Sequence, residues 1–330
     1  PHLSTAWEDD IKKHGGFRFS NGTGHNDIDY LRKTGLMPLE VARKDNPYIE
    51  AFWKWFPMIY RDLKVFRMTG GEPLMDKNTF KVFDYVNQNP NPFLDLSITS
   101  NMCPPQDALF DRFLDKIKAC EEIRVWEDPE RFNPDSGNHW YVAPAYKHFS
   151  LYVSVDGVGK QAEYMRTGLK CDHWERNFTQ AIERGFKVNI MCTFNVLCVA
   201  TFQNFLQRVM HWRKIYGKEA LAFDTPYLKE PPHWMLNILP EPFNKYMDKH
   251  LAYMSNNKDY FTSVEIAKMQ RVRDYMFQNP VDTNKIKQGQ RDFYSFFTEN
   301  DKRLGTNLLK TFPEYTAFYD YCKGVYDSWK

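Results

Sequence analysis

The sequence predicts an α/β fold with a mostly parallel sheet. Short apolar stretches of strand length alternate with amphipathic stretches of helix length over about the first two thirds of the chain. Each strand–helix unit takes roughly 25 to 50 residues, which is the length of a βα unit. After residue 231 the pattern is helical with long polar faces, so we expect one domain over 1–230 and a helical extension or cap over 231–330.

Each expected element has a local signal. Gly70 and Gly71 end the first strand, Asp76 is an N-cap candidate, and Gly185 and Gly217 close two helices. The expected strands are 64–69, 93–99, 149–155, 186–196 and 220–223. The expected helices are 46–63 (broken by Pro57), 76–87, 107–120, 173–184, 201–216, 243–254 and 265–277. Residues 121–148 form a polar, Trp-containing insertion between a helix and the next strand.

The composition excludes several classes of protein. Lys and Arg total 44 and Asp and Glu total 42, so the net charge of +2 argues against a nucleic-acid binder. Apolar residues at 42% and charged residues at 26% indicate a folded globular chain, and aromatic residues at 16% are frequent. The sequence contains no run of about eighteen apolar residues and no secretion signal. We therefore expect a cytoplasmic protein that does not span a membrane.

The six cysteines form no recognisable metal or disulfide pattern. They are Cys103, Cys120, Cys171, Cys192, Cys198 and Cys322, with no CxxC pair among them. In a chain of 330 residues without a secretion signal, they indicate reduced thiols, most of them buried as small hydrophobic side chains.

Small polar and acidic residues follow four of the expected strands. Ligands of parallel α/β sheets sit at the carboxyl ends of the strands, so these residues are the candidate site. Ordinary turn formation explains any one of the loops, but four in succession less well. The loops are Thr69-Gly70-Gly71-Glu72-Pro73, Thr99-Ser100-Asn101, Ser154-Val155-Asp156-Gly157 and Thr193-Phe194-Asn195.

The Gly-Gly-Glu-Pro loop carries the most information. Two adjacent glycines allow positive φ and a close approach of the backbone to a ligand. Glu72 then supplies an acceptor for a cation such as an amino-acid ammonium group, and Pro73 sets the exit of the turn.

Three segments, taken in their order along the chain, are RMTGGEPLM, SITSN and YVSVDG, and the third is followed by Tyr164-Met165-Arg166. Together they resemble the radical S-adenosylmethionine (radical SAM) superfamily, in particular its twitch/SPASM-type branch. The resemblance covers roughly residues 60–225. It implies a partial (β/α)6 TIM-like barrel that lacks its first strand. It also implies a cofactor site made of Gly70, Gly71, Glu72, Pro73, Asn101, Ser154, Asp156, Arg166, Thr193 and Asn195.

The resemblance implies a role for each of these residues. The loop at Glu72 would hold the amino group of S-adenosylmethionine, and Arg166 would pair with its carboxylate. Ser154 and Asp156 would face the ribose, and Thr193 and Asn195 would lie near the nucleoside. Asn101 is in doubt, because Met102 stands where relatives often have glycine.

The family's chemistry also needs a [4Fe–4S] cluster held by a CxxxCxxC loop before the glycine-rich motif. No cysteine precedes Cys103, and residues 1–7 resemble the segment that follows the last cluster cysteine. We therefore expect an N-terminally truncated chain that is inactive by itself, with a true loss of the cluster as the alternative.

The resemblance implies reductive cleavage of S-adenosylmethionine to a 5′-deoxyadenosyl radical, which takes a hydrogen atom from a peptide, small molecule or nucleotide. An electron donor such as flavodoxin or ferredoxin is implied as a partner. The aromatic residues Trp126, Trp140 and Tyr141 and the helical tail could form a lid.

The alternative function is that of a cluster-free barrel that binds a peptide or nucleotide without catalysis. An ordinary methyltransferase would instead need a glycine-rich loop after its first strand.

Overall fold

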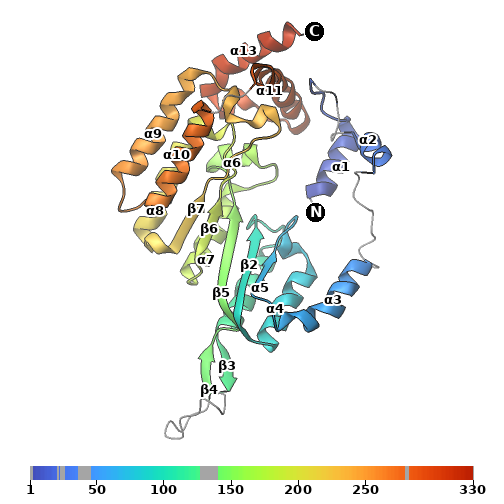
Figure 1. Cartoon of the computed structure of the whole chain (residues 1–330), viewed down its shortest axis with the longest axis vertical. Coiled ribbons are helices and arrows are strands. Elements are labelled where there is room, and N and C mark those ends of the chain that lie inside the picture. Colours follow the sequence, from blue (N-terminus) through green and yellow to red (C-terminus); the bar gives the residue numbers. More distant parts are fainter. Residues whose placement is uncertain are drawn as a thin grey trace. The chain divides into compact units, whose positions relative to one another are not determined.

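The computed structural model describes residues 3–20, 22, 27–35, 46–126, 140–278 and 282–329 (Figure 1). The chain divides into two compact units. Unit 1 contains residues 38–152, with 1–2, and unit 2 contains residues 3–37 and 153–330. The division falls inside one strand, β5, so each unit is described by itself. The predicted division at residue 230 is a different one and stays a prediction.

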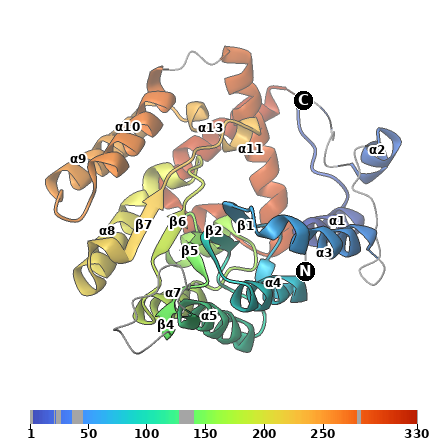
Figure 2. The ribbon, with the colours of Figure 1, turned by 60° about the horizontal axis from the view of Figure 1, so that its bottom comes forward.

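Unit 1 contains the first two strands of the predicted sheet and the helices that follow them. Strand β1 pairs with β2 in parallel, from Val65 opposite Asp95 to Met68 opposite Ile98. Helices α4 and α5 pack against each other (Figure 2). The elements are α3 (Pro47–Tyr60), β1 (Val65–Met68), η2 (Pro73–Met75), α4 (Lys77–Gln88), β2 (Asn91–Ser100), α5 (Asp107–Glu121), β3 (Ile123–Trp126), β4 (Trp140–Ala143) and most of β5 (Tyr146–Ser154).

The interior of unit 1 explains why these elements form where the pattern predicts them. Phe83 of α4 and Phe113 of α5 are fully buried, with ring centroids 5.8 Å apart. Asn91 at the start of β2 donates from its side-chain amide to the carbonyls of Tyr60 and Leu63, at 3.0 and 3.2 Å. This side chain satisfies carbonyls at the end of α3, where a helix has no partners of its own.

One expectation about unit 1 is wrong, and one feature of it was not predicted. Helix α3 continues through Pro57, which we expected to break it. Pro57 is exposed and costs the helix one hydrogen bond, whereas Phe56 and Tyr60 on the other face are buried and keep the two halves aligned. In addition, the insertion 121–148 contains the antiparallel strands β3 and β4, paired from Ile123–Ala143 to Trp126–Trp140. We did not predict these strands.

Unit 2 contains the remaining parallel strands and most of the helices. Strand β6 pairs with β7 in parallel, from Val188 opposite Leu221 to Met191 opposite Asp224. The elements are α1 (Leu3–His14), α2 (Ile28–Lys33), α6 (Gly159–Met165), α7 (Cys171–Glu183), β6 (Val188–Met191), α8 (Cys198–Tyr216), β7 (Leu221–Asp224), α9 (Asn244–Asn256), α10 (Ser263–Gln278), α11 (Thr283–Leu304), α12 (Leu308–Thr311) and α13 (Thr316–Asp327), joined by the short 3₁₀ helices η4 (Lys218–Ala220), η5 (Pro232–Trp234), η6 (Leu236–Ile238), η7 (Glu241–Phe243) and η8 (Pro313–Tyr315).

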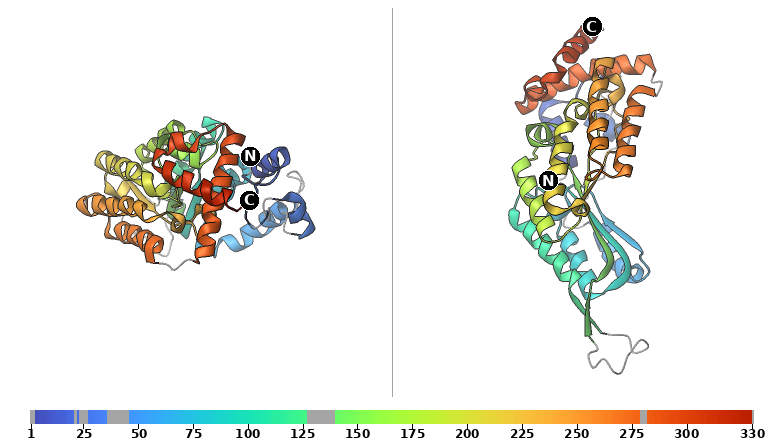
Figure 3. Two further views of the ribbon diagram at one scale, coloured as in Figure 1. Left: turned by 90° about the horizontal axis from the view of Figure 1, so that it is seen from above. Right: turned by 90° about the vertical axis from the view of Figure 1, so that its left-hand side faces the viewer.

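The helices after residue 231 form part of unit 2. Helix α9 packs between α8 and α10, and α11 packs against α13 (Figure 3). Arg213 of α8 and Glu265 of α10 form a buried ion pair, with Nη2 2.6 Å from Oε1. The same guanidinium donates to the carbonyl of Leu221 at 3.0 Å, which connects two helices to the start of β7. A buried charge pair of this kind is tolerated because the charges compensate each other and both terminal nitrogens of the guanidinium have acceptors, although its buried Nε has none among the described residues.

The N-terminal segment of unit 2 lies against helix α11, nearly 300 residues later in the chain. Asp292 accepts hydrogen bonds from the amide and hydroxyl of Ser20 at 2.8 and 2.5 Å. Arg303 pairs with Asp10 at 2.8 Å and stacks over the ring of Phe17 at 3.9 Å.

The hydrogen-bonded strand order is β1-β2-β5-β6-β7, with β3 and β4 forming a separate two-stranded sheet. The α/β class and the five predicted strands are therefore confirmed, although β6 is shorter than expected. Closure into a barrel stays a prediction. No described helix has an apolar stretch long enough to cross a membrane.

Candidate functional site

The loop after β1 has the backbone that its two glycines predict. Gly70 has a φ of +142°, a conformation that residues with a Cβ rarely adopt. A Cβ built on Gly70 would meet no heavy atom within 4 Å. Glycine is therefore required by conformation and not by crowding. Glu72 is the N-cap of η2 and Pro73 is its first residue, so the turn closes directly on the carboxylate.

The Glu72 carboxylate is the centre of a hydrogen-bonded cluster inside unit 1. Its Oε1 accepts from the amide of Leu74 at 3.2 Å and from the hydroxyl of Ser100 at 2.8 Å. Its Oε2 accepts from the amide of Asn101 at 2.7 Å. We call Glu72, Leu74, Ser100 and Asn101 the Glu72 cluster. Through it, the end of β2 meets the loop after β1, as the parallel arrangement predicts.

Burial and hydrogen bonding act on the Glu72 carboxylate in opposite directions. Only 9% of the residue is exposed, and this burial raises the pKa of the carboxyl group above its ordinary value. Hydrogen bonds from Asn101, Ser100 and Leu74 lower the pKa and offset part of that rise. A carboxylate has about four lone-pair positions, and three are occupied here, so one remains for a cationic ligand.

The turn after β2 contains Asn101 and Met102, the residue that stands where relatives often have glycine. The side chain of Asn101 accepts from the amide of Cys103 at 2.8 Å, and the amide of Met102 donates to Ser100 Oγ at 2.9 Å. Met102 has a φ of +56°, which is the left-handed region that favours glycine. Met102 thus adopts the backbone that a glycine would have. Its fully buried side chain holds it in this strained conformation.

A second cluster lies in unit 2, around Asp156 just after β5. Arg166 faces this carboxylate with two nitrogens: Nη2 donates to Oδ1 at 3.0 Å and Nε lies 2.8 Å from Oδ2. The amide of Thr193, after β6, donates to Oδ1 at 2.7 Å. We call Asp156, Arg166 and Thr193 the Asp156 cluster. The cluster connects the ends of two strands. It engages the Nε and Nη2 atoms of the guanidinium, which leaves the Nη1 edge of Arg166 for another acceptor.

Asn195 and two sulfur atoms adjoin this cluster. The Asn195 amide donates to the carbonyl of Thr193 at 3.1 Å, and its oxygen accepts from Leu197 at 3.0 Å. The thiol of Cys198 donates to the carbonyl of Asp156 at 3.4 Å and lies 3.9 Å from Met165 Sδ. Ser154, the last residue of β5, is half-buried.

The structure therefore collects the predicted residues into two groups. Gly70, Gly71, Glu72, Pro73 and Asn101 belong to unit 1, and Ser154, Asp156, Arg166, Thr193 and Asn195 belong to unit 2. Sequence reasoning did not single out Ser100, although the Thr-Ser-Asn turn was noted. It also did not single out Met165 and Cys198. Their only signal was proximity to predicted residues along the chain.

The cysteines do not fit the ligand set of a [4Fe–4S] cluster. That cluster needs three thiolates converging on iron, and the described residues contain no such group of metal-binding side chains. Burial raises the pKa of the Cys120 thiol to about 12, and burial also raises those of Cys171, Cys192 and Cys322. These buried thiols are neutral and act as core residues, as predicted.

The lid stays a prediction. The backbones of Trp126, Trp140 and Tyr141 belong to β3 and β4, and their side chains lie outside the described residues.

Comparisons with known proteins find only distant likenesses. No protein-family model matches the sequence, and no curated protein matches it. Streptococcus suis SuiB bound to S-adenosylmethionine matches with a TM-score of 0.40 and 10% identity, over 64% of this chain and 42% of that one. Native anSMEcpe with bound AdoMet and Cp18Cys peptide matches with a TM-score of 0.37 and 12% identity, over 58% and 47%. SuiB bound to the precursor peptide SuiA matches with a TM-score of 0.35 and 7% identity, over 76% and 60%. The chain thus spans less than half the length of the first two structures.

Proposed function

We propose that this chain is the S-adenosylmethionine-binding part of a radical SAM enzyme of the twitch/SPASM type. The observation that carries the proposal is the buried Glu72 carboxylate, held by three donors at the ends of two parallel strands, in the loop whose sequence resembles the family motif. A substrate of peptide, small-molecule or nucleotide class and a flavodoxin or ferredoxin as electron donor belong to the same proposal.

The Glu72 cluster is suited to an ammonium group. Its donors leave one lone-pair position on the carboxylate, and a Cβ on Gly70 would meet only open space. Burial of the carboxylate strengthens its interaction with any cation that reaches it, because the local dielectric constant is low. In this chain, Glu72 would hold the amino group, and the glycine backbone would allow the ligand to approach closely.

The Asp156 cluster supports a different part of the proposal. Asp156 fixes one edge of the Arg166 guanidinium, so the arginine is oriented before a ligand arrives. Arg166 would then offer its Nη1 edge to a carboxylate. Ser154, Thr193 and Asn195 stay proposed contacts of the nucleoside, since the resemblance alone assigns them.

The reaction proposed is reductive cleavage of S-adenosylmethionine, for which the family uses an iron–sulfur cluster. The six cysteines of this chain do not fit that cluster, so its thiolates would have to come from outside these 330 residues. The same observation favours the second candidate function, a cluster-free protein that binds a ligand without catalysis. Iron content and 5′-deoxyadenosine formation after anaerobic reconstitution of the full-length protein distinguish the two.

Binding of S-adenosylmethionine to the chain itself tests the proposal. Equilibrium dialysis with the methyl-labelled compound should show saturable binding, which Glu72→Gln should weaken about tenfold or more, because it removes a charge-assisted contact. Glu122→Gln is the matched control, since Glu122 is 60% exposed in an ion pair on the same unit. No binding by the folded chain, or equal binding by both variants, would contradict the proposal.

A further inference from the structure

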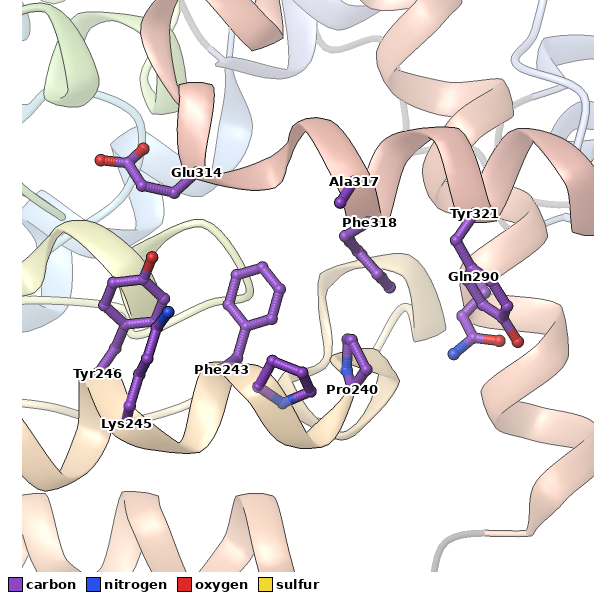
Figure 4. A pocket seen from close by; sticks show the side chains of 10 residues that line it. Pro240, Phe243, Lys245, Tyr246, Gln290, Glu314, Ala317, Phe318 and Tyr321 are labelled. Carbon is purple, nitrogen blue, oxygen red and sulfur yellow. The ribbon is translucent and has the colours of Figure 1, made fainter.

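Unit 2 contains a cavity that the proposed function does not use. It has a volume of about 370 Å³ and lies between the segment 240–246, which includes η7 and the start of α9, and helix α13 (Figure 4). This volume is within the range of sites that enclose a small organic molecule. The described cavity lies among residues 240–321, all of which belong to unit 2.

Four of the ten residues that line the cavity are aromatic: Phe243, Tyr246, Phe318 and Tyr321. Phe243 packs against Tyr246 and Phe318, with ring centroids 5.7 and 5.9 Å apart. Phe243 and Phe318 are buried, which makes this part of the wall rigid, whereas Tyr321 is 54% exposed at the edge. Ala317 lines the cavity between these large side chains and leaves space beside them. Such a wall favours a flat aromatic group over a flexible or charged one.

Two opposite charges stand on facing walls of the cavity. Figure 4 shows Lys245 and Glu314 toward the end where Tyr246 lies, with Gln290 and Tyr321 at the other end. Lys245 and Glu314 are both exposed, and no ion pair among the described residues involves either of them; Lys245 lies 5.2 Å from the Tyr246 ring. A cation and an anion that form no ion pair with the described residues, beside aromatic side chains, match a ligand that carries both charges itself.

The far end of the cavity has one oriented polar group. Gln290 is 7% exposed, and its side-chain nitrogen donates to the carbonyl of Ile238 at 2.9 Å. That bond fixes the amide, and its oxygen keeps its capacity to accept a hydrogen bond. A ligand whose aromatic group ends in a donor, such as a phenol or an indole N–H, would satisfy it.

We propose that this cavity binds a free aromatic α-amino acid. The ammonium group would face Glu314, the carboxylate would face Lys245, and the ring would lie against Phe243 and Phe318. Because Gln290 favours a donor, tyrosine and tryptophan should bind better than phenylalanine by about three- to tenfold, the usual value of one neutral hydrogen bond. This site is independent of the proposed S-adenosylmethionine site.

Saturation-transfer NMR and calorimetric titration of the whole chain test the proposal with L-tyrosine, L-phenylalanine and N-acetyl-L-tyrosine amide. We expect L-tyrosine to bind, the uncharged amide to bind at least tenfold more weakly, and Ala317→Phe to abolish binding by filling the cavity. Lys245→Met should weaken L-tyrosine binding roughly fivefold. Lys249→Met, a change of an exposed lysine one turn further along α9, should have no effect.

Three results would overturn the proposal. The first is no binding of L-tyrosine to a chain whose melting curve shows it to be folded. The second is equal binding of the amino acid and its uncharged amide, which would mean that the two charges are not used. The third is binding of a peptide with an internal tyrosine in preference to the free amino acid, which would assign the cavity to a peptide partner instead. None of these depends on S-adenosylmethionine, so failure of either site can be recognised separately.

Discussion

Asp156 and Arg166 form a two-point ion pair, with Nη2 3.0 Å from Oδ1 and Nε 2.8 Å from Oδ2. The pair joins Asp156, two residues after β5, to Arg166, the residue after α6, and Oδ1 also accepts from the amide of Thr193, two residues after β6. The carboxylate therefore organises three segments of unit 2. The ligand-binding role proposed for Arg166 depends on this carboxylate, because it holds the guanidinium in its orientation.

Removing the Asp156 carboxylate should destabilise the chain. Asp156→Ala leaves the guanidinium and the Thr193 amide without their acceptor, so we expect a loss of about 3 kcal/mol in the free energy of unfolding, measured with urea. Asp156→Asn keeps one oxygen for the amide and should cost less. Asp29→Ala, in a pair with exposures of 53% and 95%, is the control and should cost under about 1 kcal/mol. Equal losses for Asp156→Ala and Asp29→Ala would refute the organising role.

The stability contribution of Glu72 should depend on pH. Burial raises its pKa in the folded chain above the ordinary value of 4.5, so folding favours the protonated form. The stability linked to this group is then fully present below pH 4.5 and lost as the pH rises through the raised pKa. As the pH rises from 4.5 through the raised pKa, the unaltered chain should lose unfolding free energy relative to Glu72→Gln. Above that pKa the difference between the two should level off. A difference that stays constant from pH 4 to pH 7.5 would contradict this.

Gly289 should not tolerate a side chain. A Cβ at this position of α11 would lie 2.6 Å from Ile238 Cγ2 and 2.8 Å from the Pro232 carbonyl oxygen. We expect Gly289→Ala to lower the unfolding free energy by about 1–3 kcal/mol, because the backbone of η5 must move. Gly324→Ala is the matched control: it lies within α13, meets nothing within 4 Å, and should stabilise by about 0.5–1 kcal/mol. Thermal melting of both variants measures the contrast, and the same sign in both would count against this account.

The buried pair Arg213–Glu265 should matter far more than an exposed one. Both side chains are at most 6% exposed, so Glu265→Gln leaves a buried guanidinium uncompensated and should cost about 3–5 kcal/mol. Asp248→Asn breaks the Arg273 pair, whose side chains are 31% and 54% exposed, and should cost about 1 kcal/mol or less. Urea unfolding of the two variants gives the comparison. A cost for Glu265→Gln as small as that for Asp248→Asn would show that the guanidinium finds other acceptors.

The candidate site could be predicted only in part. The loop Gly70–Pro73 was recognisable because its conformation depends on glycine and proline within four consecutive residues. Asp156, Thr193 and Asn195 were recognisable because they lie at or just past the carboxyl end of an expected strand. That Ser100 donates to Glu72, or that Arg166 pairs with Asp156, was not recognisable, since a side-chain partner depends on which backbone segments become neighbours in space.

The sequence by itself determined the α/β class, the five strands of the main sheet and the conformation of the Glu72 loop, because apolar periodicity and glycine act on neighbouring residues. Only the tertiary structure decided that α3 continues through Pro57, that β3 pairs with β4, and that Asp292 binds Ser20. It also decided which chemistry each cluster offers, by burying Glu72 and by engaging one edge of Arg166. The physical reason is the same in each case: these outcomes come from contacts between residues distant in the chain, and their free energy is set by burial, which no local pattern specifies.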